Sequence, residues 1–423
     1  MKLTELPPEL IEEILVFCDP VDVAQAAQTC TALRAIVYFA EDSKLWRELY
    51  LAQPFDDPRK CISQDGRTRT EPVPWKNDLQ RIIRARTVVN AEDSAKVLRE
   101  GELETVLETF LMLICNVPPW TPSGDLSMNL GWSTVMLERK FLDWVEGLDK
   151  RTFAEKQLAS RIHSYYGLTR HDLALESRVE SRSYVYSLEQ YKPETEYGPF
   201  LEGETVDWEH IRMIHHVMSM HLVELEDDDE HFRFAIFPMS MPFIQPVLSP
   251  DINLNEENDW AAVAGPWSVS FCFIDHRDLL RYNETGLFLS NHSHIQDTSI
   301  FEDPVFREEF RSLQAKLTVT HTEHDPEHPD RPKIYFFGEM EEPSNSTMSG
   351  HVKMTKDNQI RWHFVSGDQA TGVWSSEGIQ VGGIRSSYGV LGTWSTVFHD
   401  DDDPVGPFWL RKQHDKSPTL PVT

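Results

Sequence analysis

The sequence predicts an α+β protein with three parts: a three-helix N-terminal unit, a helical linker region and a C-terminal antiparallel β-barrel-like domain. Three observations carry this prediction. Apolar residues recur at helical steps near the N-terminus, a helical period continues through the middle of the chain, and short alternating apolar runs follow after about residue 260. The 423 residues, 40% of them hydrophobic, are enough for two or three domains with their own cores.

The N-terminal unit is expected over residues 1–50. Its first helix has an apolar face formed by Leu6, Leu10, Ile14, Leu15 and Cys18. Asp19-Pro20 ends this helix, Asp22 caps a second helix running through "VAQAAQTCTALRAIVYF", and "DSKLWRELY" supplies a third. A core this small is marginal by itself, so the apolar face is expected to contact a partner.

A polar linker over residues 51–75 and a helical spacer over residues 76–190 are expected next. In the spacer, Thr152 and Glu155 form a capping box ahead of "FAEKQLASRIHSYYG", and Gly167 can end that helix. A further helix lies in "VDWEHIRMIHHVMSMHLVEL", whose expected core face comprises Trp208, Ile211, His215, Met218 and Leu222.

The β-rich domain is expected over residues 198–412, followed by a tail over residues 413–423. Strands are predicted in "WSVSFCFID", "KLTVTHT", "KIYFFGEM" and "GVLGTWSTVFHD". The segment "HVKMTKDNQIRWHFVSG" reads as a hairpin around the turn Lys356-Asp357-Asn358. Many antiparallel strands with Gly-rich connections over about 200 residues predict a closed or nearly closed barrel.

Charge and composition narrow the function. With 40 Lys and Arg against 69 Asp and Glu, the net charge is -29, which disfavours a phosphate-binding groove and favours a protein partner over nucleic acid. The longest apolar run, "FLMLIC", is far too short to cross a bilayer, so no membrane association is expected. Five scattered cysteines without a C-x-x-C pair predict a reducing compartment, cytoplasmic or nuclear.

The chemistry-bearing motifs are weak. His321, His324 and His328 have spacings that could meet a metal, and the acidic runs "ELEDDDEHF" and "HDDDDPVGPF" could offer oxygens to calcium, but loops and acidic turns explain them more simply. The chain has no G-x-S-x-G, phosphate-binding loop or H-E-x-x-H. We therefore expect no metal, no cofactor and no active site, and an independent hydrolase is the weakest of three hypotheses.

The N-terminal motifs "LPPEL", "DPVDV", "CTALR" and "LWRELY" resemble the F-box in order and spacing. A helix-turn-helix DNA module also has three short helices, but residues 1–50 hold four basic against nine acidic residues. The resemblance implies docking on a Skp-type adaptor, and through it on a cullin, within a ubiquitin ligase. The adaptor-binding residues it implies are Leu6, Pro7, Leu10, Ile14, Leu15, Leu33, Leu45 and Trp46.

The run from Arg361 to Lys412 is similar to the C-terminal region of a group of fungal F-box proteins, and more distantly to animal F-box-only proteins whose barrel holds a degron. This resemblance implies a non-catalytic substrate receptor for an unknown protein. A binding barrel needs aromatic walls and a few fixed polar groups, and the candidates are Trp267, Trp374, Arg385, Ser386 and Trp394. For Arg385 a competing possibility is an ion pair with an acid such as Glu377 inside the barrel. The alternative is a small-molecule-binding barrel that uses the N-terminal unit for assembly or turnover.

Overall fold

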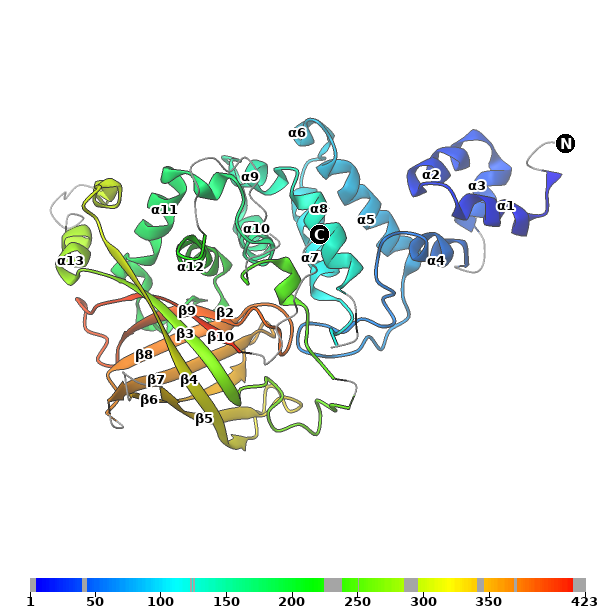
Figure 1. The fold of residues 1–423 in the computed structure, drawn as a ribbon. Coiled ribbons are helices and arrows are strands. Elements are labelled where there is room, and N and C mark those ends of the chain that lie inside the picture. Colours follow the sequence, from blue (N-terminus) through cyan, green and yellow to red (C-terminus); the bar gives the residue numbers. More distant parts are fainter. Residues whose placement is uncertain are drawn as a thin grey trace. The chain divides into compact units, whose positions relative to one another are not determined.

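A computed structural model describes residues 5–39, 44–121, 124, 126–223, 238–249, 251–284, 296–340, 346–368 and 371–413 (Figure 1). The chain forms two compact units. The N-terminal unit comprises Met1–Ser63, Arg67–Pro118 and Leu126–Phe141, and the C-terminal unit comprises Gln64–Gly66, Pro119–Asp125 and Leu142–Thr423. The main division therefore falls inside the stretch that the sequence assigns to one helical spacer.

The described part of the N-terminal unit begins with four helices, and the prediction of three was wrong. The expected second helix is two, because Cys30 has an extended backbone with φ -157° and ψ 159°. The helices are α1 (Pro8–Val16), α2 (Pro20–Thr29), α3 (Thr31–Phe39), α4 (Lys44–Leu51), α5 (Trp75–Val89), α6 (Ser94–Val97), α7 (Leu103–Cys115) and α8 (Met128–Leu137). Pro8 and Pro20 open α1 and α2, where a missing N–H costs nothing.

One continuous core joins the first four helices to α5. The Trp46 indole on α4 is buried and donates to the Val37 carbonyl at 2.8 Å, which ties α4 to α3. At the end of α4, the Tyr50 ring meets the Trp75 ring of α5 edge-on at 5.4 Å. The small helical module therefore does not rely on its own core alone, which answers the size problem posed by the sequence.

A buried carboxylate fixes the start of α8 in the same unit. Asp56 accepts hydrogen bonds from the Ser127 hydroxyl at 2.5 Å and from the backbone amides of Met128 and Asn129 at 3.1 and 3.0 Å. The Asn129 side chain in return accepts from the Asp56 amide at 2.9 Å. A negative charge at a helix N-terminus is favourable, so this segment of the predicted polar linker is firmly held.

The helices of the C-terminal unit begin at α9 (Phe141–Glu146), whose first residue belongs to the N-terminal unit. The predicted capping box of Thr152 and Glu155 is confirmed, and Gly167 ends that helix with φ 108°. In α12 the predicted core residues are buried except Leu222, which lies beyond the helix end and is half-buried. The remaining helices are α10 (Phe153–Tyr166), α11 (Leu175–Val185), α12 (Trp208–Met220) and α13 (His276–Glu284).

Eight antiparallel strands close into a barrel in the order β10-β3-β4-β5-β6-β7-β8-β9, which confirms the predicted fold class. Two of these strands, β8 and β10, were not predicted from the sequence. The barrel strands are β3 (Gly265–Ile274), β4 (Glu308–Glu323), β5 (Lys333–Met340), β6 (Ser346–Met354), β7 (Ile360–Asp368), β8 (Trp374–Gln380), β9 (Val390–Thr396) and β10 (Gly406–Lys412). Outside the barrel, β1 (Phe200–Leu201) and β2 (Thr205–Val206) form a separate two-stranded sheet.

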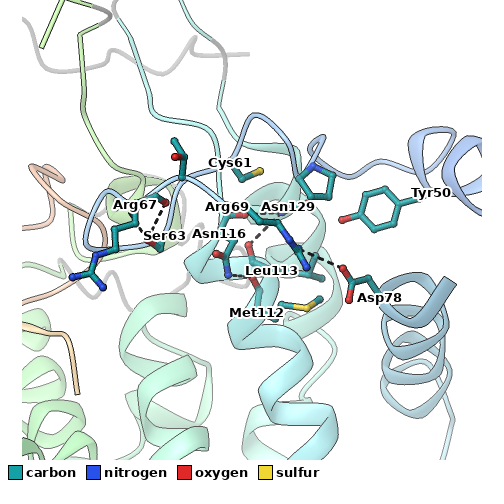
Figure 2. Close-up of a pocket in the computed structure, with 12 residues that line it drawn as sticks. Tyr50, Cys61, Ser63, Arg67, Arg69, Asp78, Met112, Leu113, Asn116 and Asn129 are labelled. Carbon is teal, nitrogen blue, oxygen red and sulfur yellow. Dashed lines mark hydrogen bonds and ion pairs between the residues drawn. The ribbon is translucent and has the colours of Figure 1, made fainter. Parts of the chain in front are cut away.

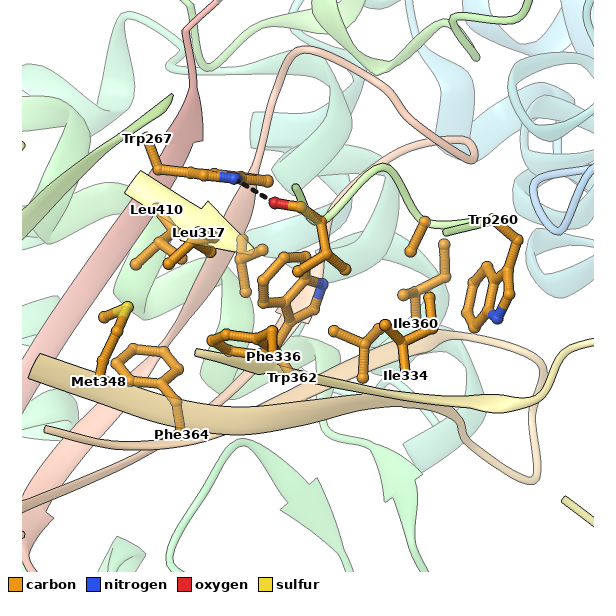
Figure 3. Packing of buried hydrophobic residues seen from close by; sticks show 14 of the residues in the cluster. Trp260, Trp267, Leu317, Ile334, Phe336, Met348, Ile360, Trp362, Phe364 and Leu410 are labelled. Atoms are coloured by element: carbon orange, nitrogen blue, oxygen red, sulfur yellow. Dashed lines mark hydrogen bonds between the residues drawn. The ribbon is translucent and has the colours of Figure 1, made fainter. Parts of the chain in front are cut away.

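The barrel interior is packed with aromatic and aliphatic side chains at one end. Trp267 and Trp362 meet edge-on at 5.1 Å, and the Phe336 ring lies 5.5 Å from Trp362 (Figure 3). Glycine is required where strands β8 and β9 pass beneath a large ring. A Cβ on Gly392 would lie 2.1 Å from a carbonyl oxygen of β8 and 2.6 Å from the Phe408 ring.

Helices cover the outer face of the barrel on the side of β3, β9 and β10 (Figure 1). The Cys272 thiol of β3 lies 3.5 Å from the Met218 sulfur of α12. After β8, the Tyr388 hydroxyl donates to the Ser164 carbonyl of α10 at 2.9 Å.

Candidate functional site

Helix α1 divides its apolar residues between a core and a surface. Ile11 and Leu15 are 2% and 5% exposed and belong to the core of the N-terminal unit. Leu10 and Ile14 are each 44% exposed, and Phe17, at the helix end, is 91% exposed. Since Leu10, Ile14 and Phe17 follow steps of four and three residues, they form one outward-facing apolar stripe, which we call the α1 stripe.

The predicted adaptor-binding residues fall into two groups. Leu10 and Ile14 belong to the α1 stripe, Pro7 is exposed and Leu6 is half-buried. The others are buried in the core of the unit: Leu15, Leu33, Leu45 and Trp46. Two exposed rings, Phe17 and Phe39, were not predicted as contact residues, because an aromatic residue at a helix end is equally compatible with a core position.

The comparison with known families agrees with this module. The F-box-like family matches residues 3–52, so the chain carries an F-box-like domain that comprises helices α1 to α4. F-box domains bind Skp1-type adaptors, which supports an adaptor as the partner of this segment. No solved structure matches the chain.

A pocket of about 230 Å³ lies in the N-terminal unit, between the end of α4 and helices α5 and α7 (Figure 2). Burial raises the pKa of the Asp78 carboxyl, although Arg69 stands 3.7 Å away and opposes this shift. Burial, together with the nearby Asp56 and Asp57 carboxylates, raises the pKa of the Cys61 thiol to about 12. The thiol therefore stays protonated at neutral pH and is a poor nucleophile.

A larger cavity of about 690 Å³ occupies the end of the barrel away from the packed tryptophans. Two of the predicted substrate-binding residues line it, and their rings meet edge-on at 5.2 Å: Trp374, 38% exposed, and Trp394, half-buried. The other aromatic side chains of the lining are Phe271, Phe273, Phe364 and Phe408. The structure thus brings together two of the five predicted residues and adds four phenylalanines. Three of these, Phe271, Phe273 and Phe364, were predicted only as strand residues.

The other three predicted substrate-binding residues do not line this cavity. The Trp267 indole is buried in the packed end and donates to the Val263 carbonyl at 2.7 Å, and the Ser386 hydroxyl donates to the Val381 carbonyl at 2.9 Å. The Arg385 guanidinium donates to the backbone carbonyls of residues 259 and 260 at 2.6 and 3.1 Å.

The suggested pairing of Arg385 with Glu377 is wrong. The carboxylate nearest to Arg385 is that of Glu257, at 3.9 Å. Glu377 instead accepts from Arg361 at 2.8 Å and lies 2.6 Å from the His363 ring nitrogen. Sequence proximity misled the expectation, because β8 carries Glu377 to the outer face of the barrel beside β7.

The described residues contain no group of His, Cys, Asp or Glu side chains that could hold a metal ion, and His321 lies in strand β4, not in the expected loop. His321 stacks on Tyr335 at 4.4 Å, and His328 is buried with its ring nitrogen 3.8 Å from Asp325. In the turn after β9, Asp403 accepts from the Thr396 hydroxyl and the Asp400 amide. The other acidic run, residues 224–232, lies outside the described residues, and no helix of the described part is long and apolar enough to span a bilayer.

A buried ion cluster joins the helices of the C-terminal unit. His163 on α10 lies between two carboxylates, with Glu146 at 2.5 Å and Asp172 at 2.8 Å, and Arg212 on α12 contacts Glu146 at 2.9 Å. Burial alone would lower the pKa of His163, but the two carboxylates outweigh it and raise this pKa to about 10. Two cations therefore balance two anions away from water, as a buried ion cluster requires.

Proposed function

We propose that this chain is the substrate-recognition subunit of a Skp–cullin–F-box ubiquitin ligase. The observation that carries the proposal is that the matched F-box-like segment is also the segment whose first helix exposes the α1 stripe. Such a receptor has no active site of its own: it binds the adaptor at one end and presents a target protein for ubiquitin transfer. The partner subunits carry out ubiquitin transfer, and the complex acts in the cytoplasm or nucleus.

The α1 stripe supplies the adaptor contact in this proposal. Leu10, Ile14 and Phe17 are large apolar side chains on one side of a short helix, and covering them with a partner removes apolar surface from water. The predicted contact residues that are buried keep α1 in place: Leu15, Leu33, Leu45 and Trp46. Their part in adaptor binding is therefore indirect, through the shape of the module.

The barrel supplies the target contact. Trp374 and Trp394 have the features of binding-site aromatic residues, because large partly exposed rings contribute strongly to protein interfaces. Trp267, Arg385 and Ser386 hold the barrel and its connections together, so they support the target contact only through the fold. The identity of the target protein is a separate question from the class of receptor.

The first test is co-purification of the full-length chain with a Skp-type adaptor. Leu10→Asp combined with Ile14→Asp should weaken adaptor binding by at least 100-fold, because each unpaired carboxylate in a desolvated contact costs on the order of several kcal/mol. Since both positions are exposed in the free chain, the melting temperature should stay within a few degrees of the wild-type value.

A matched control adds the same two charges elsewhere in the module. Gln25→Asp combined with Gln28→Asp changes two exposed positions on α2, and adaptor binding should stay within about threefold of wild type. Adaptor capture by the α1 double variant at the wild-type level would contradict the proposed function.

A further inference from the structure

The cavity at the open end of the barrel has the size of a small-molecule site. Its volume of about 690 Å³ lies within the range of roughly 300–1,000 Å³ typical of ligand pockets. Val269, Phe364 and Phe408 form its floor, since these three side chains line the cavity and also belong to the packed core. The cavity is therefore continuous with a rigid interior and is not a shallow surface groove.

The walls of the cavity present aromatic edges and faces in fixed arrangements. Trp374 and Trp394 lie at 89° to each other, and Phe271 meets Trp394 at 82° with ring centroids 6.4 Å apart. The Trp394 indole is held by a hydrogen bond to the Cys272 carbonyl at 3.2 Å. Rings that are fixed in this way lose little entropy when a flat apolar group packs against them.

Two hydroxyl groups inside this apolar lining have no partner among the described residues. Ser366 on β7 and Ser376 on β8 line the cavity, and Ser376 is only 4% exposed. By contrast, the Ser270 hydroxyl on β3 donates to Ser312 on β4 at 3.1 Å, and the Ser386 hydroxyl after β8 donates to a carbonyl at 2.9 Å. The Ser376 hydroxyl is a hydrogen-bond donor among apolar side chains of the lining, so it favours a ligand atom that can pair with it.

The lining holds three charged side chains, Asp275, Arg311 and Asp368, and all three are exposed. Arg311 is exposed, lies over the Phe273 ring at 5.2 Å and makes no ion pair among the described residues. Asp368, also exposed, is on β7. Since these three charges remain in water, the interior of the cavity selects an uncharged group.

We propose that the barrel cavity binds a compact, largely apolar small molecule whose uncharged carbonyl or hydroxyl oxygen accepts a hydrogen bond from Ser376. The volume, the fixed aromatic walls and the unpaired hydroxyls all favour the same ligand chemistry. This site goes beyond the proposed receptor function and does not depend on it. A ligand of this kind would end beside Trp374, so its presence would change the surface that the barrel offers to a target protein.

Two fluorescent dyes test the proposal with the full-length protein. Prodan is a compact uncharged naphthalene with one carbonyl acceptor, and pyrene is a hydrocarbon of similar size with no hydrogen-bonding group. Ser366→Phe, which places a ring in the cavity, should weaken the binding of both dyes at least tenfold. The matched control is Ser349→Phe on the neighbouring strand, at an exposed outward position beside Val365, and it should bind both dyes as wild type does.

A second variant tests the hydrogen bond and does not depend on how Ser366→Phe folds. Ser376→Ala should weaken prodan binding about three- to tenfold, the usual range for one hydrogen bond, and leave pyrene binding unchanged. Failure of the wild-type protein to bind either dye would overturn the proposal, as would equal dye binding by Ser366→Phe and Ser349→Phe or equal effects of Ser376→Ala on the two dyes. Adaptor capture is measured separately, so failure of the receptor function would not be mistaken for failure of this site.

Discussion

The buried His163 cluster predicts a stability that falls as the pH rises above neutrality. An unfolded histidine has a pKa near 6.5, whereas the pKa of His163 in the folded chain is about 10. The cluster therefore contributes its full stability below about pH 6.5 and loses it as the pH rises towards 10. At about 1.36 kcal/mol per unit of pKa, the loss between pH 6.5 and 9.5 is on the order of 3 kcal/mol.

The assay is urea unfolding of the full-length protein at several pH values between 6.5 and 9.5. His163→Gln removes the titrating group and leaves Glu146 and Asp172 without their shared cation, so this variant should be several kcal/mol, roughly, less stable at pH 6.5. The difference between wild type and His163→Gln should then shrink as the pH rises, because the wild-type cluster loses its own proton.

A nearby histidine provides the control. His215 is also buried, and burial lowers its pKa to about 3, so it is neutral throughout this pH range in the folded chain. An unfolded histidine is also largely neutral above pH 6.5, so His215→Gln should retain the wild-type slope of stability against pH. A constant difference between wild type and His163→Gln from pH 6.5 to 9.5 would refute the assigned charge state of His163.

Two further substitutions test the barrel. Arg385→Ala removes two hydrogen bonds to carbonyls of residues 259–260 and should lower stability by about 1–3 kcal/mol. The control, Arg277→Ala at an exposed position, should have almost no effect. Equal melting temperatures of the Arg385→Ala and Arg277→Ala variants would show that the Arg385 contact contributes nothing to stability. Gly392→Ala forces a methyl group to within 2.1 Å of a β8 carbonyl and should cost at least about 3 kcal/mol, but Gly131→Ala on α8 meets open space and should be neutral or slightly stabilising. Normal stability of Gly392→Ala would mean that β8 and β9 can separate without cost.

Local patterns predicted much of the helical structure. The capping box at Thr152, the end of that helix at Gly167 and the buried face of α12 follow from residues within one or two helical turns of each other. The break at Cys30 was not predicted, because no proline or glycine marks it and the residues on both sides are compatible with one helix. Here the backbone conformation of a single residue decides between one helix and two.

The strands were predicted where apolar residues alternate and missed where they do not. The sequence of β8, "WSSEGIQ", has small and polar residues at most positions, so its alternation is invisible without its neighbours. Its interior residue Ser376 and outer residue Glu377 acquire their roles only from β7 and β9 on either side. The cavity and the ion pairs of Glu377 arise from this long-range pairing, which a local pattern does not encode.

In the first helix, the repeat of apolar residues predicts an apolar surface but does not say which residues form it. Leu10, Ile11, Ile14 and Leu15 repeat with a step of four, so two adjacent stripes share one apolar pattern. Only the packing of α1 against α3 and α4 decides that Ile11 and Leu15 face the core and that Leu10 and Ile14 remain outside. The apolar face of α1 is wider than the core of its own module covers, as in a helix that packs on two sides. The apolar surface left exposed on α1 therefore connects the fold of residues 3–52 to partner binding.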